Sequence, residues 1–171
     1  MIKKIFLILM IISIKSSVLA EVPHFLDFNY ILNESNAGKK AQTFLKNKLD
    51  NGIKSLTKKE KTIQEKEKKL IQKKKIISPE EYKKEIETLR TSVSKLRKER
   101  STLINTIAKQ KKKAKDELLK SLNPIIKDYM IEKKIRMVAN KKALVLADEN
   151  LDITQDIIKI LNSKLKEIKL N

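Results

Sequence analysis

The sequence predicts an α+β fold that is mostly helical, in which a small sheet-containing body for oligomerisation carries a long antiparallel helical hairpin as a coiled-coil arm. Of the 171 residues, 36% are charged and 4% are aromatic, with Lys, Glu, Leu and Ile dominant, as is typical of long helices. Two Gly and three Pro offer few of the tight turns that a many-stranded sheet needs. Charge is concentrated in the middle of the chain and apolar residues at its two ends, which separates an arm from a body.

The N-terminal residues 1–20 have the pattern of a secretory signal peptide. Lys3 and Lys4 precede an apolar run from Ile5 to Ile14, and Val18-Leu19-Ala20 has the small or short residues of a peptidase site. The run is short for a bilayer span, although a transmembrane anchor is the alternative interpretation. We therefore expect cleavage after Ala20 and export of residues 21–171, without a lipid anchor because Glu21 and not Cys follows the cut.

The positive charge lies mostly in the predicted arm. The whole chain has a formal net charge of +19, and residues 46–117 hold 24 basic and 11 acidic residues. Only four of the basic residues of the chain are Arg, which is the residue suited to bidentate contacts with phosphates and guanine edges. We therefore expect no nucleic-acid partner, and the codon bias of an AT-rich genome is an alternative origin of the Lys excess.

The segment 46–117 has the apolar period of a helical hairpin. Its first part repeats an apolar residue every seven positions, and its second part alternates spacings of four and three. The two stripes are Leu49, Leu56, Ile63, Leu70 and Ile77, and then Tyr82, Ile86, Leu89, Val93, Leu96, Arg100, Leu103, Ile107, Gln110 and Ala114. In an antiparallel hairpin with a tight turn, the numbers of two facing residues have a constant sum, and this register places Glu60 near Arg100. Some layers of the seam are polar, so we expect the arms to bend and splay.

The tip of this hairpin is predicted near residues 77–79. Ser78 is a favoured N-cap, Pro79 is favoured at the first helical position, and Glu81 completes a capping box. A second helix therefore begins here and returns beside the first.

The body is assembled from residues 21–45 and 118–171, because neither end alone could bury a core. We expect three strands, at Val22–Phe28, Ile135–Ala139 and Ala143–Ala147, the last two as a hairpin through Asn140-Lys141-Lys142. Pro124 predicts a helix kink, and Asp152 predicts the N-cap of a last helix from Ile153 to about Leu165. Three strands leave open sheet edges, which favours oligomerisation.

The residues of catalytic sites are missing from this sequence. Without Cys there is no thiolate chemistry and no Cys-based zinc site. The single His24 is better explained as a packed or surface residue than as a ligand, and Gly38 and Gly52 are too far apart to form a phosphate loop. Glu80-Glu81 and Glu65–Glu67 are better explained as cap and surface charges. We expect no enzyme, and no catalytic, cofactor-binding or metal-binding residues.

Two short motifs resemble those of the Skp/OmpH family. Leu26-Asp27-Phe28 followed by residues 35–41, which read Ser-Asn-Ala-Gly-Lys-Lys-Ala, resembles the opening of that family, where a strand ending in Val-Asp precedes a Ser-x-x-Gly-Lys helix start. Leu146-Ala147-Asp148 with residues 151–154 resembles its closing segment. Phe28 departs from the small aliphatic residue of the family, and the hairpin is unusually rich in Lys.

The resemblance implies a homotrimeric periplasmic chaperone for outer-membrane proteins, in which three helical tentacles surround an unfolded client. A basic, mildly apolar cavity would hold such clients by steering and many weak contacts, and without a nucleotide motif the expected mechanism is ATP-independent holding. The candidate client contacts are basic residues and apolar residues off the seam: Lys73, Lys74, Lys75, Ile71, Ile76, Ile104, Leu119, Lys111, Lys112 and Lys113. Each apolar residue in this set could equally fill a gap near the seam or the body.

Two other classes of function stay open at this point. An exported structural coiled coil could bind an anionic envelope surface, lipopolysaccharide or lipid, through the basic hairpin. A nucleic-acid-binding hairpin would require that residues 1–20 are retained.

Overall fold

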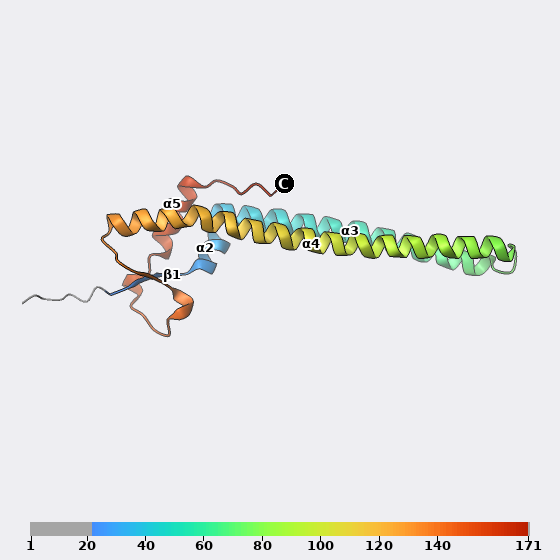
Figure 1. The fold of residues 1–171 in the computed structure, drawn as a ribbon, viewed down its shortest axis with the longest axis horizontal. Coiled ribbons are helices and arrows are strands. Elements are labelled where there is room, and N and C mark those ends of the chain that lie inside the picture. Colours follow the sequence, from blue (N-terminus) through green and yellow to red (C-terminus); the bar gives the residue numbers. More distant parts are fainter. Residues whose placement is uncertain (1–21, 171) are drawn as a thin grey trace, which may run out of the picture.

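Two long helices form a rod that ends in a small body (Figure 1). The computed structural model describes residues 22–170, so the predicted signal peptide lies outside the described residues. The elements are β1 (His24–Leu26), α2 (Phe28–Glu34), α3 (Asn36–Lys73), α4 (Pro79–Glu132), β2 (Val138–Asn140), the 3-10 helices η1 (Lys141–Ala143) and η2 (Glu149–Leu151), and α5 (Thr154–Lys164). The fold is thus the predicted α+β class, mostly helical, with a long antiparallel hairpin.

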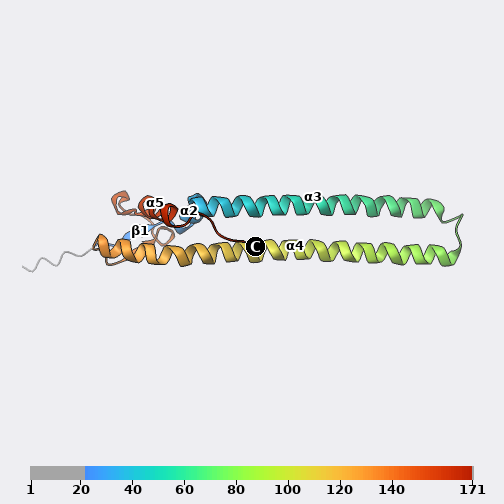
Figure 2. The same ribbon diagram turned by 90° about the horizontal axis from the view of Figure 1, so that it is seen from above.

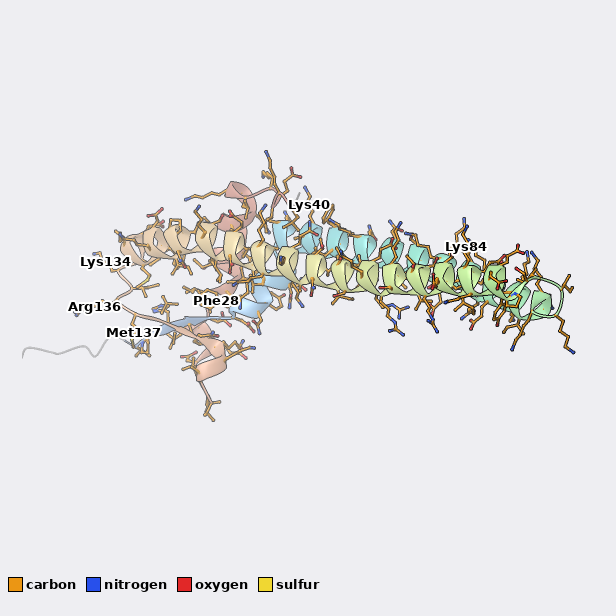
Figure 3. All side chains as sticks on the ribbon, turned by 45° about the vertical axis from the view of Figure 1, so that its right-hand side comes forward. Phe28, Lys40, Lys84, Lys134, Arg136 and Met137 are labelled. Atoms are coloured by element: carbon orange, nitrogen blue, oxygen red, sulfur yellow. The ribbon has the colours of Figure 1, made fainter. Side chains whose placement is uncertain are left out.

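Helices α3 and α4 pack along the predicted seam. All of its positions are buried or half-buried except Arg100. The two helices curve gently and stay side by side to the tip (Figures 1 and 2), so the expected splaying of the arm is not observed. Their outer faces are charged, with side chains such as Lys40 and Lys84 pointing away from the hairpin (Figure 3).

The register of the hairpin agrees with the sequence prediction. The Arg100 guanidinium lies 3.2 Å from a carboxylate oxygen of Glu60, and Lys59 Nζ lies 2.7 Å from Glu99. Both pairs join α3 to α4, but exposed ion pairs of this kind stabilise by only about 0–1 kcal/mol. The seam, and not these pairs, therefore fixes the register.

Both long helices begin at a serine cap. Ser35 Oγ accepts a hydrogen bond from the Gly38 backbone N–H, and Ser78 Oγ accepts one from the Glu81 N–H, each at 3.2 Å. Pro79 is the first residue of α4, as predicted. Residues 74–78 connect the two helices at the tip, beside the predicted turn.

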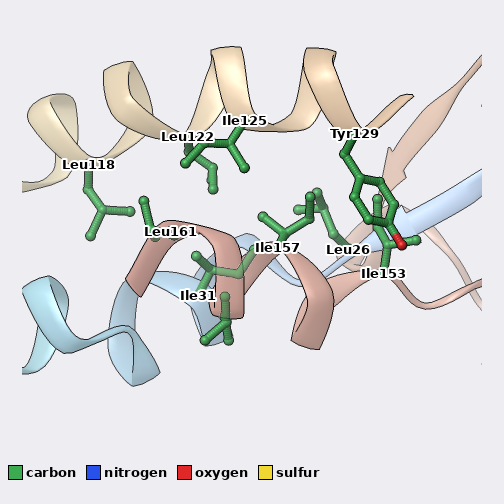
Figure 4. Close-up of a cluster of buried hydrophobic side chains, with 10 residues drawn as sticks. Leu26, Ile31, Leu118, Leu122, Ile125, Tyr129, Ile153, Ile157 and Leu161 are labelled. Atoms are coloured by element: carbon green, nitrogen blue, oxygen red, sulfur yellow. The ribbon is translucent and has the colours of Figure 1, made fainter. Parts of the chain in front are cut away.

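The core of the body is formed by α2, α4 and α5 around β1. Its buried side chains come from all four elements and from the segment just before α5 (Figure 4): Leu26, Ile31, Leu118, Leu122, Ile125, Tyr129, Ile153, Ile157, Ile158 and Leu161. Helix α4 runs through Pro124 without a break, so the kink predicted at this residue does not interrupt the helix. Pro124 lies on the exposed face, and the buried residues on either side of it hold the helix in place.

The sheet is smaller than predicted and has a different topology. Strands β1 and β2 pair in parallel, with His24 opposite Val138 and Leu26 opposite Asn140, and one further parallel bridge joins Phe25 to Asp152. The predicted β-hairpin is wrong because Asn140 keeps an extended backbone, and its side chain caps η1 instead of forming a turn. The first strand ends at Leu26, because Asp27 caps α2 by accepting a hydrogen bond from the Tyr30 N–H at 3.0 Å.

Helix α5 begins one residue later than predicted, so Ile153 and not Asp152 stands at its N-cap position. Asp152 accepts hydrogen bonds from the Thr154 backbone N–H (2.9 Å) and the Thr154 hydroxyl, and it pairs with Lys141 Nζ at 3.1 Å. The Thr154 hydroxyl in turn accepts a hydrogen bond from the Asp27 N–H at 2.9 Å. Asp152 therefore accepts a backbone N–H at the start of α5 and also joins this helix to β1 and η1.

Candidate functional site

The arm is the feature of this molecule that offers a large charged surface. Side chains tipped with nitrogen project from it along its whole length (Figure 3), in agreement with the 24 basic residues of segment 46–117. The structure places the candidate contact residues in two groups on this arm. One group lies at the tip and the other near the body. At a rise of about 1.5 Å per residue, the 34 residues of α4 between Pro79 and Lys113 separate the two groups by about 50 Å.

The tip group combines positive charge with exposed apolar side chains. Lys73 ends α3, and Lys74 and Lys75 follow it in the connection. Ile71 is 62% exposed and Ile76 is 82% exposed. An open hollow beside them is lined by apolar residues of both helices, among them Ile63, Leu70, Ile71, Tyr82, Ile86 and Val93. The tip can therefore contact apolar groups of a partner in a basic setting.

The base group lies where the arm joins the body. Lys111, Lys112 and Lys113 are all exposed on α4. Ile104, which is 54% exposed, lies between the two groups, whereas Leu119 is half-buried near the body. The predicted contact residues thus do not form one compact site, and they mark two ends of an extended surface.

A pocket at the base of the arm is a feature that the sequence reasoning missed. Its volume is about 420 Å³, and its walls are largely apolar, with lysines at the rim: Leu32, Ala41, Leu45, Ala108, Ala114, Leu118 and Ile168, with Lys111, Lys112 and Lys115. Residues from α2, α3, α4 and the segment after α5 meet here. The alternating Ile168 and Leu170 near the end of the chain were the only sequence signal for this wall.

The ionisable groups with altered pKa values belong to the body. Desolvation, together with a 2.8 Å hydrogen bond that the hydroxyl donates to Asp156, raises the pKa of Tyr129 to about 12. Partial burial acts to raise the pKa of Asp152, but hydrogen bonds from Thr154 and Lys141 outweigh it and hold this pKa below its ordinary value. Both groups tie elements of the fold together, which accounts for their shifts without any catalytic role.

Within residues 22–170, no group of three or more His, Asp or Glu is arranged to hold a metal ion. No helix within this part of the chain has both the length and the apolar character needed to cross a membrane. His24 lies half-buried in β1, where its backbone N–H donates to the Met137 carbonyl oxygen at 3.1 Å.

The most exposed large apolar side chains among the described residues are two neighbours in the body. Val145 and Leu146, which follow η1, are 105% and 92% exposed. Exposed apolar residues that are contiguous along the chain often mark an interface. This segment is the one in which the sequence predicted a third strand.

The geometry defines a class of protein in which a small α+β body carries a long helical-hairpin arm. The sequence model of the family described as outer membrane protein (OmpH-like) matches residues 24–161. The chain belongs to this OmpH-like family.

The fold is shared with a solved structure. A crystal structure from Caulobacter crescentus CB15, of a protein assigned as an OmpH-like outer membrane chaperone, is similar with a TM-score of 0.82 and 19% sequence identity. The similarity covers 88% of this chain and 90% of that one. A search of the curated proteins gave no match.

Proposed function

We propose that the protein is a periplasmic, ATP-independent holdase that binds unfolded outer-membrane proteins in a basic cavity between the arms of a homotrimer. The observation that carries the proposal is the arm itself, which is long, basic and exposed, with sparse apolar side chains at its surface. Membership of the OmpH-like family and the fold shared with a protein assigned as an outer membrane chaperone support the same function.

The charge pattern of the arm suits capture without tight binding. Exposed lysines attract an acidic unfolded chain at long range, and this attraction weakens with salt. Isolated apolar groups such as Ile71, Ile76 and Ile104 each add a weak contact with the apolar residues of the client. Many weak contacts spread over the arm hold an aggregation-prone chain and still allow its release.

The body supports the oligomeric part of the proposal. Val145 and Leu146 are almost fully exposed in the single chain, and a second copy is the natural partner to cover them. Three copies joined through this segment would place three arms around one cavity. A Val145→Asp, Leu146→Asp double variant should therefore run as a monomer in sedimentation analysis, whereas the wild type runs as a trimer.

The direct test is the aggregation of a urea-denatured outer-membrane β-barrel protein on dilution, with and without residues 21–171, in the absence of ATP. We expect suppression of light scattering at about one trimer per client. A well-folded oligomer that leaves aggregation unchanged would contradict the proposal. Salt-sensitive binding to anionic liposomes or lipopolysaccharide without protection of the client would then favour the structural coiled-coil alternative.

The two lysine groups allow the contact residues to be tested separately. Charge reversal of Lys73, Lys74 and Lys75 alters the tip, and charge reversal of Lys111, Lys112 and Lys113 alters the base. We expect each triple variant to weaken client binding several-fold while the oligomer mass stays unchanged. Reversal of Lys133, Lys134 and Lys142 on the body is a matched control, since it changes the net charge equally away from the arm. If all three triple variants weaken client binding alike, client binding depends on the net charge of the protein and not on the two lysine groups of the arm.

A further inference from the structure

The segment after α5 runs back along the base of the arm (Figures 1 and 2). Residues 165–170 have no regular secondary structure, and Leu165 has the extended angles φ −119° and ψ 108°. Burial alternates over the last three residues of the segment: Ile168 is half-buried, Lys169 is exposed and Leu170 is 3% exposed. Residues 168–170 thus present two apolar side chains to the arm with the spacing of two that is characteristic of a strand.

The arm receives this segment in a groove between α3 and α4. Leu170 packs against Ala41, Leu45 and Ala114, and Ile107 borders the same cluster. Small alanine side chains on both helices leave the room that the Leu170 side chain fills. The base pocket of about 420 Å³, with its lysine rim, continues from Ile168 on the same groove.

Gln110 adds a polar contact to the main chain of the bound segment, so this contact does not depend on which side chains the segment carries. It is 9% exposed, and its Nε2 donates a hydrogen bond to the Leu170 carbonyl oxygen at 2.5 Å. Its Oε1 is buried and has no hydrogen-bond partner among the described residues. A side-chain amide can donate to a main-chain carbonyl and accept from a main-chain N–H, so Gln110 is equipped to bind an extended backbone and is only half used here.

We infer that this groove, made by Ala41, Leu45, Ile107, Gln110 and Ala114, is a binding site for one extended segment of an unfolded client, and that residues 165–170 occupy it as an exchangeable internal ligand. The inference rests on the proposed function and names a site for it. The groove accepts apolar side chains at alternate positions together with a backbone carbonyl. Strands of outer-membrane β-barrels alternate apolar and polar residues in the same way.

The internal segment sets a threshold for binding. A ligand tethered by a few residues competes at an effective concentration in the millimolar range, so a free peptide binds weakly until the segment is released. A long unfolded client, which also contacts the lysines of the arm, can overcome this competition, because each contact makes the next one intramolecular. Occupation by the segment also keeps the groove from binding short or folded partners.

The test uses the full chain with the segment loosened. Leu170→Ser removes the buried apolar anchor, and Lys169→Ser is the matched control at the exposed neighbouring position. The probe is a fluorescein-labelled peptide with the sequence of residues 164–171, and binding is measured by fluorescence anisotropy. We expect the Kd of the peptide to be at least five-fold lower for Leu170→Ser than for the wild type, and unchanged for Lys169→Ser. An equal Kd for all three proteins, with their folds verified by circular dichroism, would overturn the inference.

A second measurement connects the groove to clients. In the Leu170→Ser protein, a urea-denatured outer-membrane β-barrel protein should displace the bound peptide. A further Gln110→Leu substitution should weaken the binding of the peptide and of the β-barrel protein. If the β-barrel protein is held soluble but does not displace the peptide, the groove binds only the internal segment. That result would overturn the inference that the groove binds clients. If no variant, nor the wild type, keeps the β-barrel protein soluble, it is the proposed function that fails.

Discussion

The arm and the body of this protein are held together in different ways. In the body, ten apolar side chains from several elements enclose one another in a single cluster. In the arm, residues 46–117, the buried positions are Leu56, Leu70, Gln110 and Ala114, and the other seam residues are half-buried, apart from the exposed Arg100. The body therefore has an enclosed core of its own, whereas the arm has only a two-helix seam that is open to water on both sides.

This difference separates stability from function along one chain. Helix α4 belongs to both regions, because its last third lies in the body core and its first two thirds form one side of the arm. The body anchors α4, so the arm needs little burial of its own and can keep a charged, exposed surface. Substitutions of equal chemistry should therefore have unequal effects in the two regions.

The largest difference is expected for leucine truncation. Leu122 is fully buried in the body, whereas Leu96 is half-buried in the arm seam. Leu122→Ala leaves a cavity and should lower the free energy of unfolding by about 3 kcal/mol. Leu96→Ala, whose site is already partly open to water, should lower it by about 1 kcal/mol. Urea denaturation followed by circular dichroism measures both. Equal losses would show that the arm seam is as tightly enclosed as the body.

The two glycines provide a second pair. A Cβ on Gly38 would lie 2.0 Å from the Leu32 carbonyl oxygen, where α2 passes close to the start of α3. A Cβ on Gly52 would meet the Leu103 side chain, at 2.5 Å from Cδ2, and this side chain can rotate away. Gly38→Ala should therefore destabilise the body by about 2 kcal/mol or more, since two backbones must separate.

Gly52→Ala should be close to neutral in the same measurement. The displacement of Leu103 is offset by the higher helix propensity of Ala, which is worth about 1 kcal/mol within a helix. A loss as large as that of Gly38→Ala would contradict the view that side chains in the arm have room to move.

The two serine caps have the same geometry but different exposure. Ser35 is fully buried and Ser78 is exposed at the tip, although each hydroxyl accepts a backbone N–H at 3.2 Å. Ser35→Ala leaves the buried Gly38 N–H without a partner and should cost about 2 kcal/mol. Ser78→Ala leaves the Glu81 N–H to hydrogen-bond with water and should cost about 0.5–1 kcal/mol. Thermal unfolding of the two variants gives the comparison, and a reversed order would contradict it.

The sequence was informative about the arm because the arm is repetitive. The seven-residue stripe, the Ser78-Pro79-Glu81 helix start and the Glu60–Arg100 pair all follow from local spacing and a single register. Along a two-helix seam, the only variable is the shift of one helix relative to the other. Once the position of the turn at the tip is known, the facing residues of every layer follow.

The body was harder to predict because its contacts join distant parts of the chain. The segment 143–147 is apolar and follows an Asn, as a β-hairpin strand would, yet β2 pairs in parallel with β1, more than a hundred residues earlier. Nothing local to Asn140 distinguishes a turn from a 3-10 cap. The base groove was missed for the same reason, since Ile168 and Leu170 meet α3 and α4 only in the folded chain.

The smallest expected effects concern carboxylates, and here the two regions differ in their pH dependence. Asp152 in the body accepts hydrogen bonds from Thr154 and Lys141 that hold its pKa below the ordinary value of 3.8. A carboxylate with a lowered pKa stabilises the folded state above its unfolded pKa, and this stabilisation is lost as the pH falls through the folded pKa. Asp152→Asn should therefore cost about 1 kcal/mol at pH 7, and the difference from the wild type should shrink as the pH falls below 3.8 and through the lowered pKa of Asp152.

Glu60→Gln is the counterpart in the arm. The Glu60 carboxylate pairs with Arg100 at 3.2 Å, but both side chains are about half exposed, so the variant should change the free energy of unfolding by less than about 0.5 kcal/mol at pH 7. Urea denaturation at pH 7, 5 and 3 distinguishes the two sites. A cost for Asp152→Asn that stays constant down to the lowest pH at which both proteins remain folded would show that the loss does not come from the charge of Asp152. The charge of Asp152 would then have no part in joining α5 to β1.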